Sequence, residues 1–309
     1  MSSISRLMRA AREGTRVVLG SSRIARRGAE GRGRASFFTG ACAPFRGGGA
    51  PFGTDVPFGP IGPDGLPTFV NWSTYGAVTP IQDQGDCGSC WAFGVAALIE
   101  ADHFIKNKEL IKLSEQHLID ANNLRNFGCK GGSTSEALEY ITRNGGIVNA
   151  ESYPYKGAQG PVQSITAPGV QIADYFCTFN GSEFMLKWSV AKGPILVTIG
   201  ADDFFMMNQY GRVLDGPAYT LDEMENLRIA HSLLVIGYGE TQLGQKIWLV
   251  KNSHGGERFL LLARDNGKIG GAFGLTRRIT RVQVSERVDV TVKSDEEMRV
   301  TPRTDWWSI

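Results

Sequence analysis

The feature that most constrains the fold of this chain is a ten-residue run, QGDCGSCWAF, at residues 84–93. It places one thiol, Cys90, at the head of an almost entirely apolar segment, residues 91–99, which predicts a buried helix that starts at Cys90. A helix N-terminus presents free N–H groups and a partial positive charge, and both favour a thiolate over a thiol. Because the Gln84 amide can donate an N–H to an oxyanion, the run indicates half of an acyl-transfer site. A structural cysteine buried on an apolar helix is the alternative interpretation.

The centre of the chain changes its periodicity near residue 155. Residues 66–155 predict helices: one over 90–106, one with Ser114 as its N-cap, and one that opens near Ser133 or Ser135 and stops at Gly145. Residues 156–280 are mainly β-prone, with short runs at 195–199, 232–238, 247–251 and 259–263 and one further helix over 182–192. A helical lobe followed by a sheet or barrel lobe predicts a two-lobed α+β fold with a cleft between the lobes.

The N-terminal segments have a different composition. Residues 1–40 hold nine arginines, no lysine and two acidic residues, which is typical of an organellar presequence and predicts a mitochondrial location. A disordered basic arm is the alternative. Residues 41–65 are rich in Gly and Pro and predict an extended linker. We regard residues 1–65 as a possible contact for a protein partner.

The C-terminal residues 281–309 predict an extension with one or two strands, because valines fall mostly on alternate positions. Trp306 and Trp307 near its end either pack on their own domain or bind a protein partner. A net charge of +2 argues against nucleic acid as a partner. No run approaches the ~20 apolar residues that cross a bilayer, so we expect no transmembrane segment.

The cysteines add one constraint. There are five, at positions 42, 87, 90, 129 and 177, so at least one thiol is unpaired. None of them stands at zinc spacing from a histidine, and we expect neither a metal nor a cofactor. Cys87 and Cys90 could form a Cys-x-x-Cys redox pair, but that interpretation leaves the rest of the run without a role.

Several motifs in order resemble the papain-like cysteine peptidase family over roughly residues 66–280. They are the run at 84–93, LPTFVNW at 66–72, LSEQHLID at 113–120, CKGG at 129–132, GGI at 145–147, YPY at 153–155, HSLLVIGYG at 231–239 and WLVKNS at 248–253. The resemblance implies the papain-like two-lobed fold. It also implies a hydrolase that cleaves peptide bonds in a protein or peptide substrate bound between the lobes.

The resemblance assigns roles to individual residues. Cys90 would be the nucleophile, His231 its acid–base partner and Asn252 the group that orients the His231 ring, while Gln84 would contribute to an oxyanion hole. Cys87 and Cys129 occupy positions that the family joins by a disulfide. The positions that correspond to substrate contacts are Trp91, Gly131, Gly132, Thr134, Ile229 and Ser232.

Four departures from the family pattern leave a second function open. His254 stands where the family has a tryptophan that shields the His–Asn hydrogen bond, so we expect solvent to enter and loosen the pair. The loop at 255–259 is shorter than the family's, no helical inhibitory propeptide is recognisable before residue 66, and the extension at 281–309 is additional. The alternative is a papain-like domain recruited as an accessory subunit of a larger assembly with weak or no peptidase activity. The alternative location is lysosomal, vacuolar or secreted, as for most of the family.

Overall fold

The computed structural model describes residues 58–121, 126–201, 205–206, 211–220, 222–223 and 230–293. All of them belong to one unit of the chain, Gly47–Ile309. The predictions for the basic arm at 1–40, for residues 41–57 of the linker, for Ile229 and for Trp306 and Trp307 lie outside the described residues. They therefore stay predictions.

The helices begin and end where local chemistry predicts. Those with described bounds are α2 (Cys90–Asn107), α3 (Glu115–Asp120), α4 (Thr134–Asn144) and α5 (Glu183–Val190), with 3₁₀ turns η1 (Gly128–Lys130) and η2 (Ala272–Gly274). Ser114 and Ser182 cap α3 and α5, because each hydroxyl accepts the N–H of the residue three positions later. Gly145 ends α4 with a φ of 83°, a conformation that favours glycine.

The strands form one nine-stranded sheet in the order β2-β3-β9-β4-β6-β7-β8-β5, with β1 paired to β6. They are β1 (Val70–Asn71), β2 (Ile147–Val148), β3 (Thr166–Phe179), β4 (Ile195–Gly200), β5 (Val213–Leu214), β6 (Ala230–Glu240), β7 (Lys246–Lys251), β8 (Leu260–Ala263) and β9 (Arg278–Thr291). The four predicted runs correspond to β4, β6, β7 and β8. β3 has no such run, because Pro168, Gly169 and two register shifts interrupt its alternation, and it was not predicted.

The boundary that we expected at residue 280 falls inside β9. This strand pairs with β3 along its whole length and with β4 at Ile279 and Thr280. Its Val282 and Val284 are buried in the same hydrophobic cluster as the helices. The valine-rich part of the expected extension is therefore integral to the fold up to Thr291.

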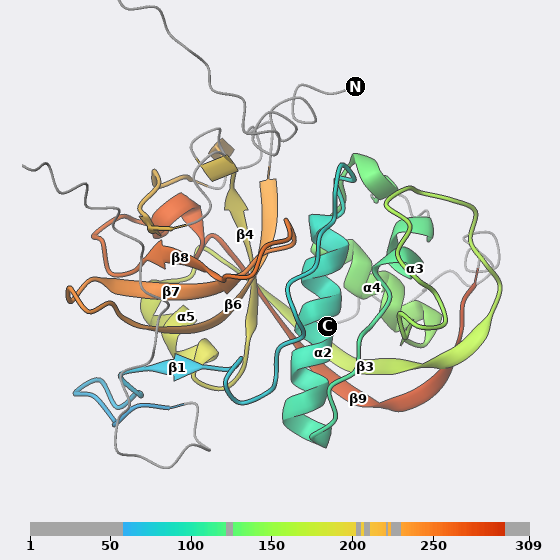
Figure 1. Cartoon of the computed structure of the whole chain (residues 1–309), viewed down its shortest axis with the longest axis horizontal. Coiled ribbons are helices and arrows are strands. Elements are labelled where there is room, and N and C mark those ends of the chain that lie inside the picture. Colours follow the sequence, from blue (N-terminus) through green and yellow to red (C-terminus); the bar gives the residue numbers. More distant parts are fainter. Residues whose placement is uncertain are drawn as a thin grey trace, which may run out of the picture. The chain divides into compact units, whose positions relative to one another are not determined.

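Two main hydrophobic clusters confirm a mixed α+β architecture with two cores. One gathers α2, α3 and α4 with parts of β3 and β9, and the other gathers β4, β6, β7, β8 and α5. Figure 1 shows α2 between α3 and α4 on one side and β6 on the other. A Cβ on Gly94 would stand 2.6 Å from Leu196 Cδ1 and 3.3 Å from Ser232 Cβ. Only a glycine lets α2 approach the sheet this closely, and this contact sets the distance between the two cores.

Candidate active site

The nucleophile candidate lies at the first residue of α2. Cys90 is a free cysteine, partly exposed, and its thiol is hydrogen-bonded to the side chain of His231. Burial raises the pKa of the thiol, but the positive charge and hydrogen bond of His231 outweigh it, with help from the backbone N–H groups of Ser232 and Trp91. The net result is a pKa below the ordinary value, which favours the thiolate.

The imidazole partner comes from the start of β6. His231 is 3 % exposed, and its Nε2 lies 2.7 Å from Asn252 Oδ1. Because an amide oxygen only accepts, Nε2 carries a proton, and Nδ1 is the nitrogen left to meet Cys90. Burial lowers the pKa of His231, whereas the Cys90 thiolate and the Asn252 hydrogen bond raise it, and the balance is a raised pKa. The lowered pKa of the Cys90 thiol and the raised pKa of the His231 imidazole together favour a thiolate–imidazolium pair.

Strand pairing brings His231 and Asn252 together. The two residues are 21 positions apart, and β6 and β7 pair antiparallel with Leu234 opposite Lys251. Asn252 follows β7 directly and is 4 % exposed. A small cavity beside it is lined by α2, through Phe93, Gly94 and Ala97, and by β6 and β7. The site thus lies where α2 meets the sheet.

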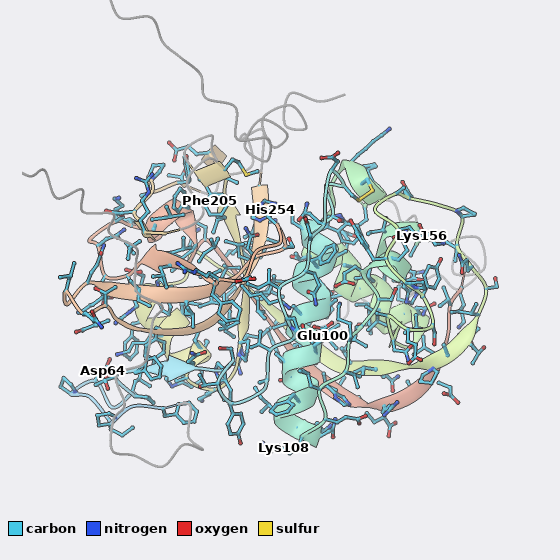
Figure 2. All side chains as sticks on the ribbon, in the orientation of Figure 1. Asp64, Glu100, Lys108, Lys156, Phe205 and His254 are labelled. Carbon is cyan, nitrogen blue, oxygen red and sulfur yellow. A yellow bond between two sulfur atoms is a disulfide. The ribbon has the colours of Figure 1, made fainter. Side chains whose placement is uncertain are left out.

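The expectation that His254 loosens this pair is wrong. The His254 ring lies against the His231 ring, with centroids 4.6 Å apart and planes inclined by 32°. Phe205, whose ring also lies near His231, is labelled beside His254 in Figure 2. His231 and Asn252 stay almost fully buried. The reason is that an imidazole is flat enough to stack and polar enough to bond, since its Nδ1 lies 3.3 Å from Asn252 Nδ2. Burial, and secondarily the charge of His231, lower the pKa of His254 to about 3, so it is neutral near pH 7.

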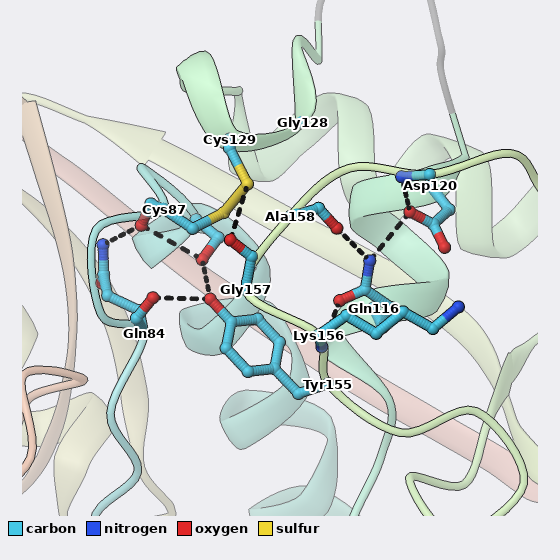
Figure 3. The surroundings of a disulfide bond; sticks show 12 residues. Gln84, Cys87, Gln116, Asp120, Gly128, Cys129, Tyr155, Lys156, Gly157 and Ala158 are labelled. Atoms are coloured by element: carbon cyan, nitrogen blue, oxygen red, sulfur yellow. Dashed lines mark hydrogen bonds between the residues drawn. A yellow bond between two sulfur atoms is a disulfide. The ribbon is translucent and has the colours of Figure 1, made fainter. Parts of the chain in front are cut away.

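Gln84 is held by hydrogen bonds at its side chain and at its backbone carbonyl. Its Oε1 accepts from the Ser253 hydroxyl at 2.6 Å, and its Nε2 donates to the Cys87 carbonyl at 2.7 Å. The Tyr155 hydroxyl donates to the Gln84 carbonyl at 2.6 Å. Figure 3 shows the contacts of Gln84 with Cys87 and Tyr155 around the disulfide that joins Cys87 to Cys129, as the resemblance predicted. The disulfide ties the loop that carries Gln84 to the loop that precedes α4.

The positions predicted for substrate contact separate into two groups. Gly131 and Gly132 lie on the loop after η1, where Gly132 is exposed and Gly131 has a φ of 114°. Thr134, Ser232 and Trp91 are buried, and Trp91 is only 1 % exposed. A Cβ on Gly132 would stand 2.6 Å from the Trp91 ring, so Trp91 supports the glycine backbone from beneath.

A buried charge network lies behind the site. Lys251 donates to the Thr79 hydroxyl at 2.7 Å, and Thr79 donates to the Glu100 carboxylate at 2.6 Å. Glu100 also accepts from Lys112 at 2.9 Å. Burial lowers the pKa of Lys251 to about 8, although the Glu100 charge opposes this effect. The network connects α2 to β7, the strand that Asn252 follows, and sequence patterning gave no signal for it.

Three residues that position the site were not predicted to do so: Gly94, Tyr155 and Ser253. A glycine inside an otherwise apolar helix signals a close approach, so Gly94 could have been found. Tyr155 and Ser253 lie within recognised motifs, but their partner Gln84 is 71 and 169 positions away. No local pattern reports contacts over such separations.

Among the described residues, no group of three or more His, Cys, Asp or Glu side chains could hold a metal ion. The helices described in this chain are also too short or too polar to cross a membrane.

Comparisons with known proteins identify a family that this chain matches. A model of the papain family of cysteine proteases matches residues 66–260. The cysteine endopeptidase Rep1 of Oryza sativa subsp. japonica is 39 % identical over 217 residues, which cover 68 % of this chain and 57 % of that protein. Zingipain-2 of Zingiber officinale is 37 % identical over 219 residues, which cover 69 % of this chain and 95 % of that protein. The chain therefore spans little more than half of Rep1 but nearly all of zingipain-2.

A solved structure of bromelain from Ananas comosus, in complex with the E64 inhibitor, is also similar. It is 32 % identical, covers 71 % of this chain and 100 % of its own, and has a TM-score of 0.64. The similarity confirms the α+β fold predicted from the motifs.

Proposed function

Because this chain belongs to the papain family of cysteine proteases, we propose that it is a peptidase that cleaves peptide bonds through an acyl-enzyme on Cys90. The observation that carries the proposal is the contact of the Cys90 thiol with His231, whose ring is held by Asn252 at 2.7 Å. The three groups come from the start of α2, the start of β6 and the residue that follows β7. Their contact brings together a nucleophile, a proton carrier and an orienting group.

The proposed reaction has two halves. The Cys90 thiolate attacks the substrate carbonyl carbon, and its electron pair forms the S–C bond while the carbonyl oxygen becomes an oxyanion. The carbonyl re-forms as the C–N bond breaks, and His231 Nδ1 gives its proton to the leaving amine. A water molecule then attacks the thioester carbonyl, and His231 takes a proton from that water. The C–S bond breaks, the carboxylic acid product is released, and Cys90 is again a thiolate beside the His231 imidazolium.

We assign the oxyanion hole to Gln84 and the Cys90 backbone N–H. The Gln84 Nε2 carries two protons, and one of them is used on the Cys87 carbonyl. The other is the group that we assign to the oxyanion. The Ser253 hydroxyl and the Cys87 carbonyl fix the amide before substrate arrives, which is the preorganisation that such a donor requires.

The substrate is proposed to lie in extended form across the loop at Gly131 and Gly132. Exposed glycine backbone can pair with an extended peptide, in the manner of an added strand. The buried Thr134 and Ser232 would shape the pocket beneath, and Trp91 would act only through the loop that it supports. Ile229 keeps its predicted role as a pocket residue.

The accessory-subunit hypothesis depended partly on a loosened His231–Asn252 pair, and that argument no longer supports it. For location, the Cys87–Cys129 disulfide favours an oxidising compartment, and we propose a lysosomal, vacuolar or secreted protein. The comparisons give no support to a mitochondrial location, which rests on residues 1–40 alone.

The test is covalent labelling with E64, the inhibitor bound by the similar bromelain structure. We expect wild type to form one adduct at Cys90 and to hydrolyse a mixed peptide substrate. Cys90→Ala should lose both. Cys177→Ala is the matched control, since Cys177 is the other free, partly exposed thiol among the described residues, and it should retain both activities. Absence of a Cys90-dependent adduct in folded wild type would contradict the proposal.

A further inference from the structure

The Asn252 side chain has neighbours on both ends of its amide. Its Oδ1 accepts from His231 Nε2 at 2.7 Å and from the backbone N–H of Ser253 at 2.8 Å. Its Nδ2 lies 3.3 Å from His254 Nδ1. An amide nitrogen only donates, so His254 Nδ1 must be the acceptor, and the proton of the neutral His254 ring must be on Nε2. The His254 tautomer and the Asn252 orientation therefore specify each other.

A flipped amide shows what this contact prevents. Rotation of the Asn252 amide by half a turn would place Nδ2 against His231 Nε2–H and against the Ser253 N–H, two donor–donor contacts. The same rotation would place Oδ1 against His254 Nδ1, which carries no proton. Each wrong contact leaves a buried polar group without its partner, which costs more than the original bond contributes. His254 thus reinforces the one orientation in which Asn252 accepts from His231.

We infer that His254 is a positioning residue for the proposed peptidase reaction: its Nδ1 accepts from Asn252 Nδ2 and so holds the Asn252 amide oxygen on His231. This inference rests on the proposed function for its kinetic consequences, but its structural part concerns only the three side chains. It gives a role to the residue at which this chain departs from the family pattern.

The charges near His254 are consistent with a neutral ring whose Nδ1 accepts a hydrogen bond. The titratable groups near His254 include His231 on β6, which in turn contacts Cys90 on α2, and Asp83, which pairs with His254 in an isolated β-bridge. A second positive charge on His254 would lie against the His231 imidazolium and would repel it. Protonation would also put a hydrogen on Nδ1 and remove the acceptor. The low pKa of His254, about 3, keeps both losses out of the neutral range.

Two substitutions distinguish the role of the His254 hydrogen-bond acceptor from the role of its flat ring. His254→Phe keeps a flat ring over His231 but has no acceptor. His254→Asn lacks the ring, but its Oδ1 can occupy the place of Nδ1 and accept from Asn252. Glu257→Ala, an exposed change on the same loop, is the matched control.

The first readout needs no catalysis. The chain has four histidines, so ¹⁵N and ¹³C NMR of histidine-labelled protein can be assigned by single substitutions. We expect wild-type His254 at pH 7 to be neutral with its proton on Nε2. We expect His254→Phe to lower the pKa of His231 by about 0.5 to 1 unit, because a less fixed Asn252 stabilises the imidazolium less. His254→Asn should restore most of that shift, and Glu257→Ala should cause none.

The second readout is kcat/KM for a peptide. We expect about two- to tenfold loss in His254→Phe, recovery in His254→Asn and no change in Glu257→Ala, from the net contribution of one hydrogen bond. A His254 proton on Nδ1, or a His254→Phe variant that matches wild type in both readouts, would overturn the inference. So would a His254→Asn variant no better than His254→Phe. If wild type hydrolyses no peptide while the NMR results hold, the proposed function fails and the positioning role stands.

Discussion

The two sides of the candidate active site are held by different kinds of structure. On the α2 side, Cys90 and Gln84 lie on one loop and helix start, which the Cys87–Cys129 disulfide and Tyr155 tie down. On the strand side, His231 and Asn252 are aligned by the β6–β7 register. The nucleophile is thus prepared mainly by its own neighbourhood in sequence, whereas its partner depends on pairing between distant segments. The following predictions test whether this division holds.

The largest effect should come from removal of the strand side's proton carrier. We expect His231→Ala to lower kcat/KM by at least about 10³-fold, because both the thiolate and the proton transfer to the leaving group depend on the imidazole. The Cys90 pKa should rise, since the His231 charge is the main influence that lowers it. The rate of Cys90 alkylation by iodoacetamide at pH 6, followed by peptide mass spectrometry, measures this change.

The matched control is His103→Gln, at a buried histidine farther along α2 that bonds the Glu109 carbonyl. It should leave the alkylation rate at pH 6 unchanged. If Cys90 in His231→Ala still reacts fast at pH 6, the helix N-terminus alone activates the thiol. The α2 side would then activate Cys90 without a contribution from the strand side.

The second effect concerns the α2 side alone. Replacement of Cys87 and Cys129 by serine opens a loop with a sequence separation of 42, and we expect a loss of about 4 kcal/mol in the free energy of unfolding. Urea unfolding under non-reducing conditions measures it, with Cys177→Ser as the control. Hydrogen exchange should rise first around residues 84–90 and 126–132. An equal rise in β6 and β7 would show that the disulfide stabilises both sides alike.

The sequence predicted the α2 side better than the strand side. The start of α2, the Ser114 cap and the Gly145 stop follow from local rules, and the structure has all three. The short apolar runs located β4, β6, β7 and β8. None of those rules gives a register, so the contact of His231 with Asn252 came only from the family resemblance.

The features that could not be predicted all depend on contacts that form only when the chain has folded. The β3–β9 pair joins residues that are 99 to 125 positions apart, from Phe179 opposite Arg278 to Thr166 opposite Thr291, and the bulges of β3 hide its period. The role of His254 was misjudged because the sequence shows a smaller ring but not where its nitrogens point. The Lys251–Thr79–Glu100 chain likewise exists only once α2 and β7 have packed.

The third prediction concerns the donor that bridges the two sides. We expect Gln84→Ala to lower kcat by about 10²- to 10³-fold with a smaller change in KM, as for loss of one oxyanion donor. Ser253→Ala removes only the hydroxyl that holds Gln84 Oε1 from the strand side, and should cost about two- to tenfold. Steady-state kinetics on both variants, with thermal unfolding as a check on folding, gives the comparison. Equal losses would mean that Gln84 acts only as structural support for the loop.

The smallest effect compares two histidines under acid: His117 on α3, which is fully buried, and His254 beside the strands, which is partly buried. Burial lowers the pKa of His117 on α3 and of His254 beside the strands to about 3. In the unfolded chain each of these histidines binds a proton when the pH falls below its ordinary pKa of about 6.5. In the folded chain it stays neutral at that pH. Stability is therefore full above pH 6.5 and falls as the pH drops toward 3, by up to about 2 kcal/mol per histidine at pH 5.

Each histidine uses Nδ1 as an acceptor, from the Val148 N–H and from Asn252 Nδ2, so protonation also removes a bond. Asparagine can replace that acceptor without a titrating ring, and we expect His117→Asn and His254→Asn each to reduce the loss in unfolding free energy between pH 7 and pH 5. Urea midpoints at the two pH values measure the change. If only His254→Asn reduces the loss in unfolding free energy, the acid sensitivity is confined to the strand side, and protonation of His117 does not destabilise the protein at pH 5. If neither does, the acid response comes from the carboxylates, with the buried Glu100 network as the first group to examine.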